Sequence, residues 1–203
     1  MDFKQLYEFS LKTMLGEGGT DKFRPITVFD IKAFLIDNTP WLGGINFHPV
    51  SCDPDDPYGH FECYGEEDSR WDDADSWVVL VTYNDDESVL NTCKRRFVWL
   101  KELMHVFDPA DSYTCSKEHF FNLMSDIETR PIDPSDAYST ENWAKWLALL
   151  IFVPKPFRDE AVKQIQDEGV SEYEIALKFR IPEAVVSALT SPHYDKAMDK
   201  YLK

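Results

Sequence analysis

Cysteine, basic residues and long apolar runs are all scarce in this sequence. Its four cysteines are scattered and form no C-x-x-C pair, which argues against disulfides and against a cysteine-based zinc site. The longest apolar run, residues 146–154, is too short to cross a bilayer. No P-loop, G-x-G-x-x-G or G-x-S-x-G motif occurs. The first residues lack the pattern of a signal peptide, so we expect a cytoplasmic protein without a membrane span.

The remaining composition is that of a globular domain. Hydrophobic residues make up 43% and aromatic residues 14% of the 203 residues, and a chain of this size buries about 70% of its unfolded surface. We expect one domain over residues 1–203. Its expected parts are N-terminal helices in 1–40, an acidic strand-and-loop region in 41–87 and a helical core in 88–190.

Negative charge is concentrated in one stretch. The chain has 21 basic and 37 acidic residues, a net charge of −16, and residues 53–87 hold thirteen acids against one base. Direct binding to nucleic acid needs clustered lysine and arginine, so we expect none. The stretch is either a solvated loop or a surface for a positively charged protein partner. The candidate binding residues are Asp53, Asp55, Asp56, Glu66, Glu67, Asp68, Asp72, Asp73 and Asp75.

The spacing of apolar residues predicts an α+β fold that is mostly helical. We expect two N-terminal helices, the second capped by Thr27. Short strands are expected at 44–50 and 58–65, and the β-branched run 77–83 predicts a further strand. Helices are predicted at 88–107, at 140–153 with Thr140 as cap, and at 158–168, 171–179 and 182–189, with a short helical piece at 119–127. The last pair resembles a helix-turn-helix, but its second helix has no Lys or Arg to contact DNA.

The residues most suited to catalysis or metal binding lie in the segment Arg95 to Phe107, RRFVWLKELMHVF. Side chains four residues apart share one helix face, which is why H-E-x-x-H holds zinc with two histidines while its Glu acts as general base. In this chain Glu102 and His105 are in register, but Lys101 stands where the first His would be. By itself, an E-x-x-H on an amphipathic helix is a common structural or surface feature.

Three ordered blocks nevertheless resemble the ImmA/IrrE family of zinc metallopeptidase-like proteins. RRFVWLKELMHVF is similar to its R-F-T-x-A-H-E-x-G-H pattern, ENWAKWLALLIFVP to its E-x-E-A-N helix, and GVSEYEIALKFRIPEAVVSAL to its C-terminal segment. The blocks cover residues 95–190, about half the chain. The resemblance implies a zincin-like scaffold and a family whose active members cut helix-turn-helix repressors, often encoded beside them on phages and other mobile elements.

The sequence departs from the family at the metal ligands. The resemblance assigns Lys101 to the first histidine position, and alignment on Pro154 assigns Trp143 to the third ligand, a Glu in the family. Glu141 lies two residues away and is expected to point to a different helix face. Only the ligand His105 and the base Glu102 remain, and one imidazole does not hold a catalytic zinc. We therefore expect no cofactor, with zinc as the alternative.

Lys101 allows two interpretations. Its ammonium could take the space and charge of Zn²⁺ and pair with Glu102, or the side chain could extend along the helix to solvent. The other histidines, His48, His60 and His119, have no ligand spacing to His105, and His119 alone is kept as a weak candidate.

These observations lead to three functional hypotheses. The first is a catalytically inactive ImmA/IrrE-like protein that binds a protein partner, such as a basic DNA-binding regulator, through its acidic stretch. The alternative is an active metallopeptidase with a rebuilt zinc site that cleaves a repressor-type protein. The third is a structural phage or mobile-element protein that has kept the scaffold and lost both activities.

Overall fold

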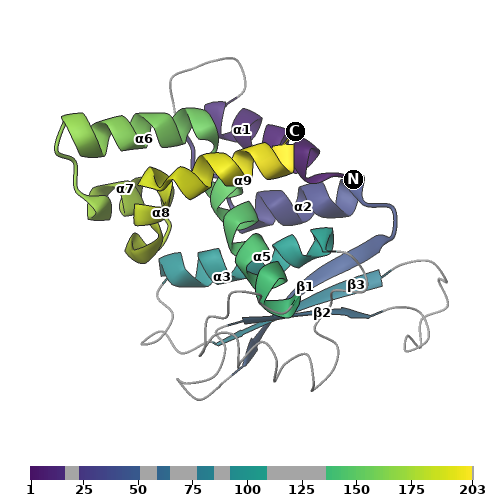
Figure 1. Cartoon of the computed structure of the whole chain (residues 1–203). Coiled ribbons are helices and arrows are strands. Elements are labelled where there is room, and N and C mark those ends of the chain that lie inside the picture. Colours follow the sequence, from purple (N-terminus) through teal and green to yellow (C-terminus); the bar gives the residue numbers. More distant parts are fainter. Residues whose placement is uncertain (17–22, 51–58, 65–76, 85–91, 109–135, 203) are drawn as a thin grey trace.

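The computed structural model describes residues 1–16, 23–50, 59–64, 77–84, 92–108 and 136–202. These residues are mostly helical and include a small three-stranded sheet, which confirms the α+β class and the helical majority (Figure 1). No helix among them is long and apolar enough to cross a membrane. The helical piece expected at 119–127 and the nine candidate acidic residues of the 53–75 region lie outside the described residues.

Helices account for both ends of the described chain. They are α1 (Phe3–Leu15), α2 (Val28–Asn38), α3 (Thr92–Met104) continued by the 3-10 turn η2 (His105–Phe107), α5 (Asp136–Phe152), α6 (Lys155–Asp167), α7 (Glu172–Phe179), η4 (Glu183–Val185), α8 (Ser187–Thr190) and α9 (Pro192–Leu202). Capping boxes begin three of them, at Asp2, Thr27 and Ser171. Each box bonds backbone N–H groups that the first helical turn leaves free.

The boundaries of several predicted helices differ from the structure. α5 already includes Asp136, so Thr140 is inside the helix and does not cap it, and α6 begins at Lys155, three residues before the predicted start. α3 is described from Thr92, the predicted start at Ser88 lies outside the described residues, and the last predicted turn is a 3-10 turn. The helix predicted at 182–189 is divided into η4 and α8, and α9 was not predicted.

The sheet combines parallel and antiparallel pairing. Its strands are β1 (Leu42–Val50), β2 (Gly59–Tyr64) and β3 (Trp77–Asn84), in the order β1-β3-β2. β3 is central, parallel to β1 and antiparallel to β2. All three predicted strand segments are confirmed. α2 packs on β1, and α3 packs on β2 and β3, so both helices cover the same face of the sheet (Figure 1).

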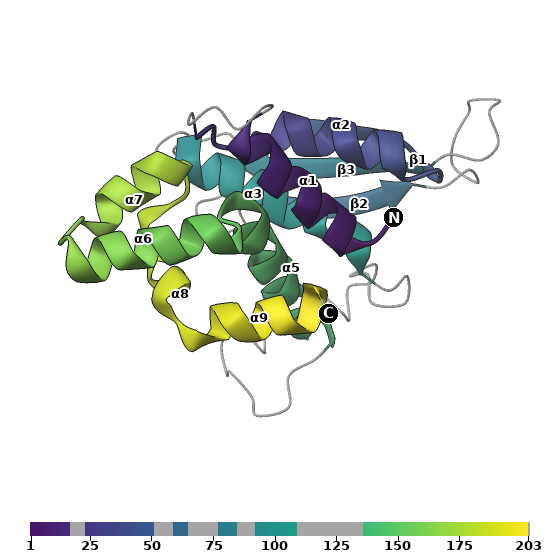
Figure 2. The same cartoon turned by 90° about the horizontal axis from the view of Figure 1, so that it is seen from above.

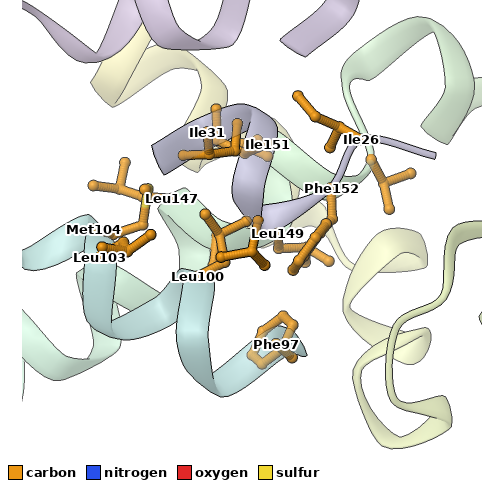
Figure 3. Packing of buried hydrophobic residues seen from close by; sticks show 14 of the residues in the cluster. Ile26, Ile31, Phe97, Leu100, Leu103, Met104, Leu147, Leu149, Ile151 and Phe152 are labelled. Atoms are coloured by element: carbon orange, nitrogen blue, oxygen red, sulfur yellow. The ribbon is translucent and has the colours of Figure 1, made fainter. Parts of the chain in front are cut away.

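α5 forms the centre of the helical layer. It contacts α1, α3 and α9, and every residue from 147 to 153 is buried. Figure 3 shows Leu147, Leu149 and Phe152 facing α3 residues such as Leu100. A helix buried in this way needs partners for its last carbonyl groups. Ser10 Oγ donates to the Ile151 oxygen at 2.6 Å, and Tyr194 OH donates to the Val153 oxygen at 2.7 Å.

Arg96 connects α3 to two distant segments. Its guanidinium donates to the carbonyl oxygens of Arg180, at the end of α7, and of Ile26, before α2, at 2.5 and 2.7 Å. The same group lies 5.0 Å from the centre of the Phe152 ring on α5. The planar, multidentate guanidinium suits this role better than a lysine would. Arg96 therefore fixes the orientation of α3, and with it the residues at the C-terminal end of that helix.

Candidate functional site

The last turn of α3 faces the N-terminal part of α5 across a group of charged side chains. Lys101, Glu102 and His105 come from α3 and η2, and Glu141 comes from α5. Lys101 Nζ lies 2.8 Å from Glu102 Oε1 and 2.5 Å from Glu141 Oε2. One ammonium thus joins carboxylates from two helices. Together with Asp108, these residues are called the charged cluster.

His105 is held by Asp108, three residues further along the chain. The distance from His105 Nδ1 to Asp108 Oδ2 is 2.6 Å. The other ring nitrogen, Nε2, is directed at the two glutamates, 3.4 Å from Glu141 Oε1 and 3.7 Å from Glu102 Oε2. It is buried and makes no hydrogen bond of good geometry within the described residues. The imidazole therefore points into the same space as the Lys101 ammonium.

Strand β2 closes the cluster from the side of the sheet. A Cβ atom on Gly59 would lie 2.5 Å from Val98 Cγ1 and 2.8 Å from Glu102 Oε1, closer than side-chain atoms pack. The ring of Phe61 lies 5.7 Å from that of His105, centre to centre. The absence of a side chain at Gly59 is what allows β2 to approach Glu102 so closely.

The cluster is largely removed from solvent. The side chains of Glu102, Asp108 and His105 are 2, 4 and 9% exposed, while those of Lys101 and Glu141 are 20 and 32% exposed. Charges in such a place are stable only when they are paired. The cluster pairs them by placing two basic groups among three carboxyl groups.

Burial and pairing have opposite effects on the pKa values. Burial by itself lowers the pKa of His105. The hydrogen bond to Asp108 and the neighbouring glutamates raise it by more than this, so that the net pKa is about 9. Burial likewise lowers the pKa of Lys101, and Glu102 and Glu141 more than offset this, so the value lies above the ordinary range for lysine. For Glu141, burial raises the pKa, while His105 and Lys101 bring it well below the ordinary range. For Asp108, burial prevails and the pKa is raised.

Three members of the cluster have the composition of a metal site. Glu102, His105 and Glu141 each offer a ligand atom, and these atoms lie within 4.8 Å of one another. One imidazole and two carboxylates are ligands that zinc accepts. The Lys101 ammonium, however, lies against an oxygen of each glutamate, where it would repel a cation. With Lys101 in this position, the arrangement does not fit a metal ion.

The structure corrects the expected position of the third ligand. Glu141, expected on a different helix face, lies beside His105, whereas Trp143 does not join the cluster. The Trp143 ring instead packs 5.1 Å from the Tyr201 ring, centre to centre, with Lys200 Nζ 3.3 Å from its centre. The expectation that Glu141 points to a different helix face from the cluster was therefore wrong. Nor does Lys101 extend to solvent, because it is engaged by two carboxylates.

The other histidines considered from the sequence are not in the cluster. His48 is exposed on β1, and half-exposed His60 lies on β2 with its Nε2 3.2 Å from Glu62 Oε1. His119 is outside the described residues. Asp108 and Gly59 were missed by sequence reasoning. The spacing of Asp108 to His105 was a local signal, whereas nothing in the sequence links Gly59 to Glu102.

Comparison with known proteins gives no match among family models, curated proteins or solved structures.

Proposed function

We propose that this chain is a zincin-like, ImmA/IrrE-like protein that has lost its metal and acts by binding a protein partner. The observation that carries the proposal is the position of Lys101 Nζ between Glu102 and Glu141. In the resembling family, the residue at position 101 is a metal-binding histidine. A lysine there supplies a positive charge from the chain itself, in the space toward which His105 Nε2 also points.

The physical argument rests on the cost of buried charge. Two carboxylates that would otherwise bind a cation must be neutralised when they are buried, since an unpaired buried charge costs several kcal/mol. In a metallopeptidase the ion does this. In this chain Lys101 does so without any ligand, and the fold no longer depends on metal. A protein of this kind keeps the scaffold while the Lewis acid needed for peptide hydrolysis is missing.

Metal binding after substitution of Lys101 tests the proposal. Lys101→His supplies a second imidazole on the face of Glu102 and His105, and Lys101→Met removes the charge without adding a ligand. The protein is purified without chelator, titrated with Zn²⁺ and Co²⁺, and its metal content measured. We expect no stoichiometric metal in the native protein and about one ion per chain in Lys101→His. Adding His105→Ala should abolish that binding.

Two results would overturn the metal-free reading. The first is stoichiometric zinc in the native protein. The second is zinc binding by Lys101→Met as tight as that by Lys101→His, since the ligand set would then not depend on residue 101. Circular dichroism of each variant shows whether it has folded, so that loss of structure is not taken for loss of a ligand.

The partner we propose is a basic DNA-binding regulator of a mobile element, bound through the acidic residues of the 53–75 region. This rests on the family resemblance and on charge complementarity. Binding of helix-turn-helix repressors encoded near the gene is measured by calorimetry, with the native chain and with Asp72, Asp73 and Asp75 changed to Asn. Loss of affinity in the variant and at high salt supports the proposal. Equal affinity of the two proteins contradicts it.

A second candidate function is an active metallopeptidase with a rebuilt zinc site. It is favoured by the convergence of Glu102, His105 and Glu141 within 4.8 Å. For this function the Lys101 ammonium must leave, so that Glu141 and His105 become ligands and Glu102 the base. Cleavage of a repressor that needs Zn²⁺ and disappears in Glu102→Gln would establish it. Under the leading proposal Glu102→Gln alters stability or partner binding only.

A further inference from the structure

A cavity of about 360 Å³, partly open to solvent, lies where the two ends of the described chain meet. It is formed by the start of α1, the turn before β1, the η2 turn, α5 and α9. Figures 1 and 2 both show the end of α9 beside the start of α1. The cavity is distinct from the charged cluster, since none of Glu102, His105 and Glu141 lines it, and Asp108 is the one cluster residue that does.

The walls of the cavity are largely aromatic. Of the eleven described residues that line it, five are aromatic: Phe3, Trp41, Phe107, Trp143 and Tyr201. Phe3 meets Phe107 edge to face, with ring centres 5.6 Å apart, and Trp143 meets Tyr201 in the same way at 5.1 Å. These contacts hold the rings in fixed orientations. Trp41 and Trp143 are each 36% exposed, although they are large apolar side chains.

Among the described residues, the charged side chains that line the cavity are both acidic. They are Asp2 and Asp108, and this described part of the lining holds no lysine, arginine or histidine. The ring of Trp143 already attracts a cation of this chain, because Lys200 Nζ lies 3.3 Å from its centre. Aromatic faces and carboxylates both attract positive charge, and the carboxylates also repel anions.

We propose that this cavity binds an organic cation with an alkylated ammonium group. Such a group carries its charge on an apolar, weakly hydrated surface, so it can contact the aromatic walls while the carboxylates balance its charge. The cavity falls within the range of volumes, roughly 300–1,000 Å³, of ordinary small-molecule sites. A neutral apolar ligand would gain nothing from the negative potential at Asp2 and Asp108, and an anion would be repelled by it.

The test compares choline with its neutral carbon analogue, 3,3-dimethylbutan-1-ol, which has the same shape. Any tag is removed, because both chain ends lie near the cavity. Binding is followed by calorimetry and by the indole N–H resonances in two-dimensional NMR. We expect choline to bind at least about fivefold more tightly than the neutral analogue and to shift the resonances of Trp41 and Trp143. Equal binding of the two, or no binding of choline at tens of millimolar, would overturn the proposal.

Substitutions locate the site. Trp143→Leu should reduce the affinity for choline by about fivefold, whereas Trp146→Leu, on the same helix but outside the cavity lining, should leave it unchanged. Asp2→Asn preserves a good N-cap for α1 and should weaken binding of choline but not of the neutral analogue. An equal effect of the Trp143 and Trp146 substitutions would place binding elsewhere and contradict the assignment.

An alkylated ammonium group occurs both in free small molecules such as choline and in methylated lysine side chains of proteins. A short peptide containing Nε-trimethyl-lysine is therefore titrated alongside choline, with the unmodified lysine peptide as control. Tighter binding of the methylated peptide assigns the cavity to a modified protein, and tighter binding of choline assigns it to a small molecule. Both results support the shared chemistry. Equal binding of the methylated and unmodified peptides, together with choline no tighter than its neutral analogue, refutes it.

Discussion

At the scale of single residues, the charged cluster is a case of buried charge made tolerable by pairing. Lys101 satisfies carboxylates from two helices, and Asp108 orients His105 through Nδ1. Removing any one member leaves another without its counter-charge in a place that water barely reaches. The cluster is therefore stable only when its members carry the right charges, and its contribution to the free energy of unfolding depends on pH.

The raised pKa of His105 predicts a loss of stability in mild alkali. The folded protein keeps the imidazole protonated up to about pH 9, whereas the unfolded chain loses this proton near pH 6.5. Between these values the folded state binds more protons, so the free energy of unfolding falls as the pH rises. The total loss from this group is about 3 kcal/mol by the 1.4 kcal/mol per pKa unit rule. Below pH 6.5 the contribution is fully present.

Urea unfolding from pH 6 to 10 measures this effect, with His105→Gln as the comparison. The variant should lose the decline between pH 6.5 and 9, and the NMR titration of the native imidazole should show a midpoint near 9. An imidazole that titrates near 6.5 in the folded protein would contradict the prediction. Glu141 and Asp108 act in the acid range. The lowered pKa of Glu141 stabilises the folded protein at pH values above the pKa of this group in the unfolded chain, and the contribution is lost as the pH falls. The raised pKa of Asp108 has the opposite effect on stability.

The ion pair between Lys101 and Glu141 predicts non-additive substitutions. Glu141→Gln should cost about 1–3 kcal/mol, less than the 3–5 of a fully buried pair because the Glu141 side chain is 32% exposed. Lys101→Met should cost at least as much, since it leaves two carboxylates uncompensated. The double variant should be more stable than the sum of the two losses implies, by about 0.5–3 kcal/mol. Urea denaturation of all four proteins measures this coupling. Strict additivity would mean that the two side chains do not interact.

At the scale of elements, the contact between β2 and α3 depends on one glycine. Gly59 lies against Val98 and Glu102 of α3, so the strand covers the cluster at a distance that no other residue allows. The two elements are 28 residues apart at their nearest ends. Their approach is a property of the packed sheet and helix and not of either segment alone.

Gly59→Ala should therefore destabilise the protein by about 1–3 kcal/mol, the usual cost of overpacking. Gly44→Ala in β1 is the matched control, because a Cβ there would have no atom within 4 Å. Unfolding free energies are measured for both, and the NMR resonances of His105 report whether the cluster is displaced. A cost for Gly59→Ala no greater than that of Gly44→Ala would contradict the close approach. Adding Val98→Ala should recover part of the loss.

At the scale of the whole molecule, α5 is the element on which the others converge. α1 and α9, at opposite ends of the described chain, both pack on it and supply the hydroxyl groups that bond its last carbonyls. Tyr7 of α1 adds a link to the start of α6, directly after α5, since its hydroxyl accepts a hydrogen bond from the Lys155 backbone N–H at 2.9 Å. The two ends of the described chain are thus joined through polar contacts to the buried helix.

Tyr194→Phe tests this linkage. It removes the hydroxyl that donates to the Val153 oxygen and leaves that buried carbonyl without its partner, for an expected cost of about 1–3 kcal/mol. Tyr173→Phe, on a side chain that is 56% exposed, should change stability by less than about 0.5 kcal/mol. Denaturant unfolding compares the two. Equal losses of unfolding free energy in the two variants would show that the hydrogen bond from Tyr194 does not stabilise the protein.

Much of the secondary structure follows from the sequence because its causes are local. The Thr27 and Ser171 caps, the β-branched run of β3 and the apolar stretch of α5 each determine an element through residues a few positions apart. The mostly helical α+β class follows from the order of these elements, whereas the mixed pairing of the sheet was not predicted. Boundaries were less accurate where no local signal marked them, as for Thr140, which lies inside α5 instead of capping it.

The cluster and the cavity depended on the tertiary structure. The sequence placed Lys101, Glu102 and His105 close together in the last turns of one helix, because helical spacing decides this; that residue 101 stands where H-E-x-x-H has its first histidine came from comparison with the motif. Whether Glu141 or Trp143 faced that helix depended on the rotation of α5 about its axis, which is set by its packing against α1, α3 and α9. A rotation of this kind results from many long-range contacts together. For that reason the partner of Lys101 could be recognised only in the folded chain.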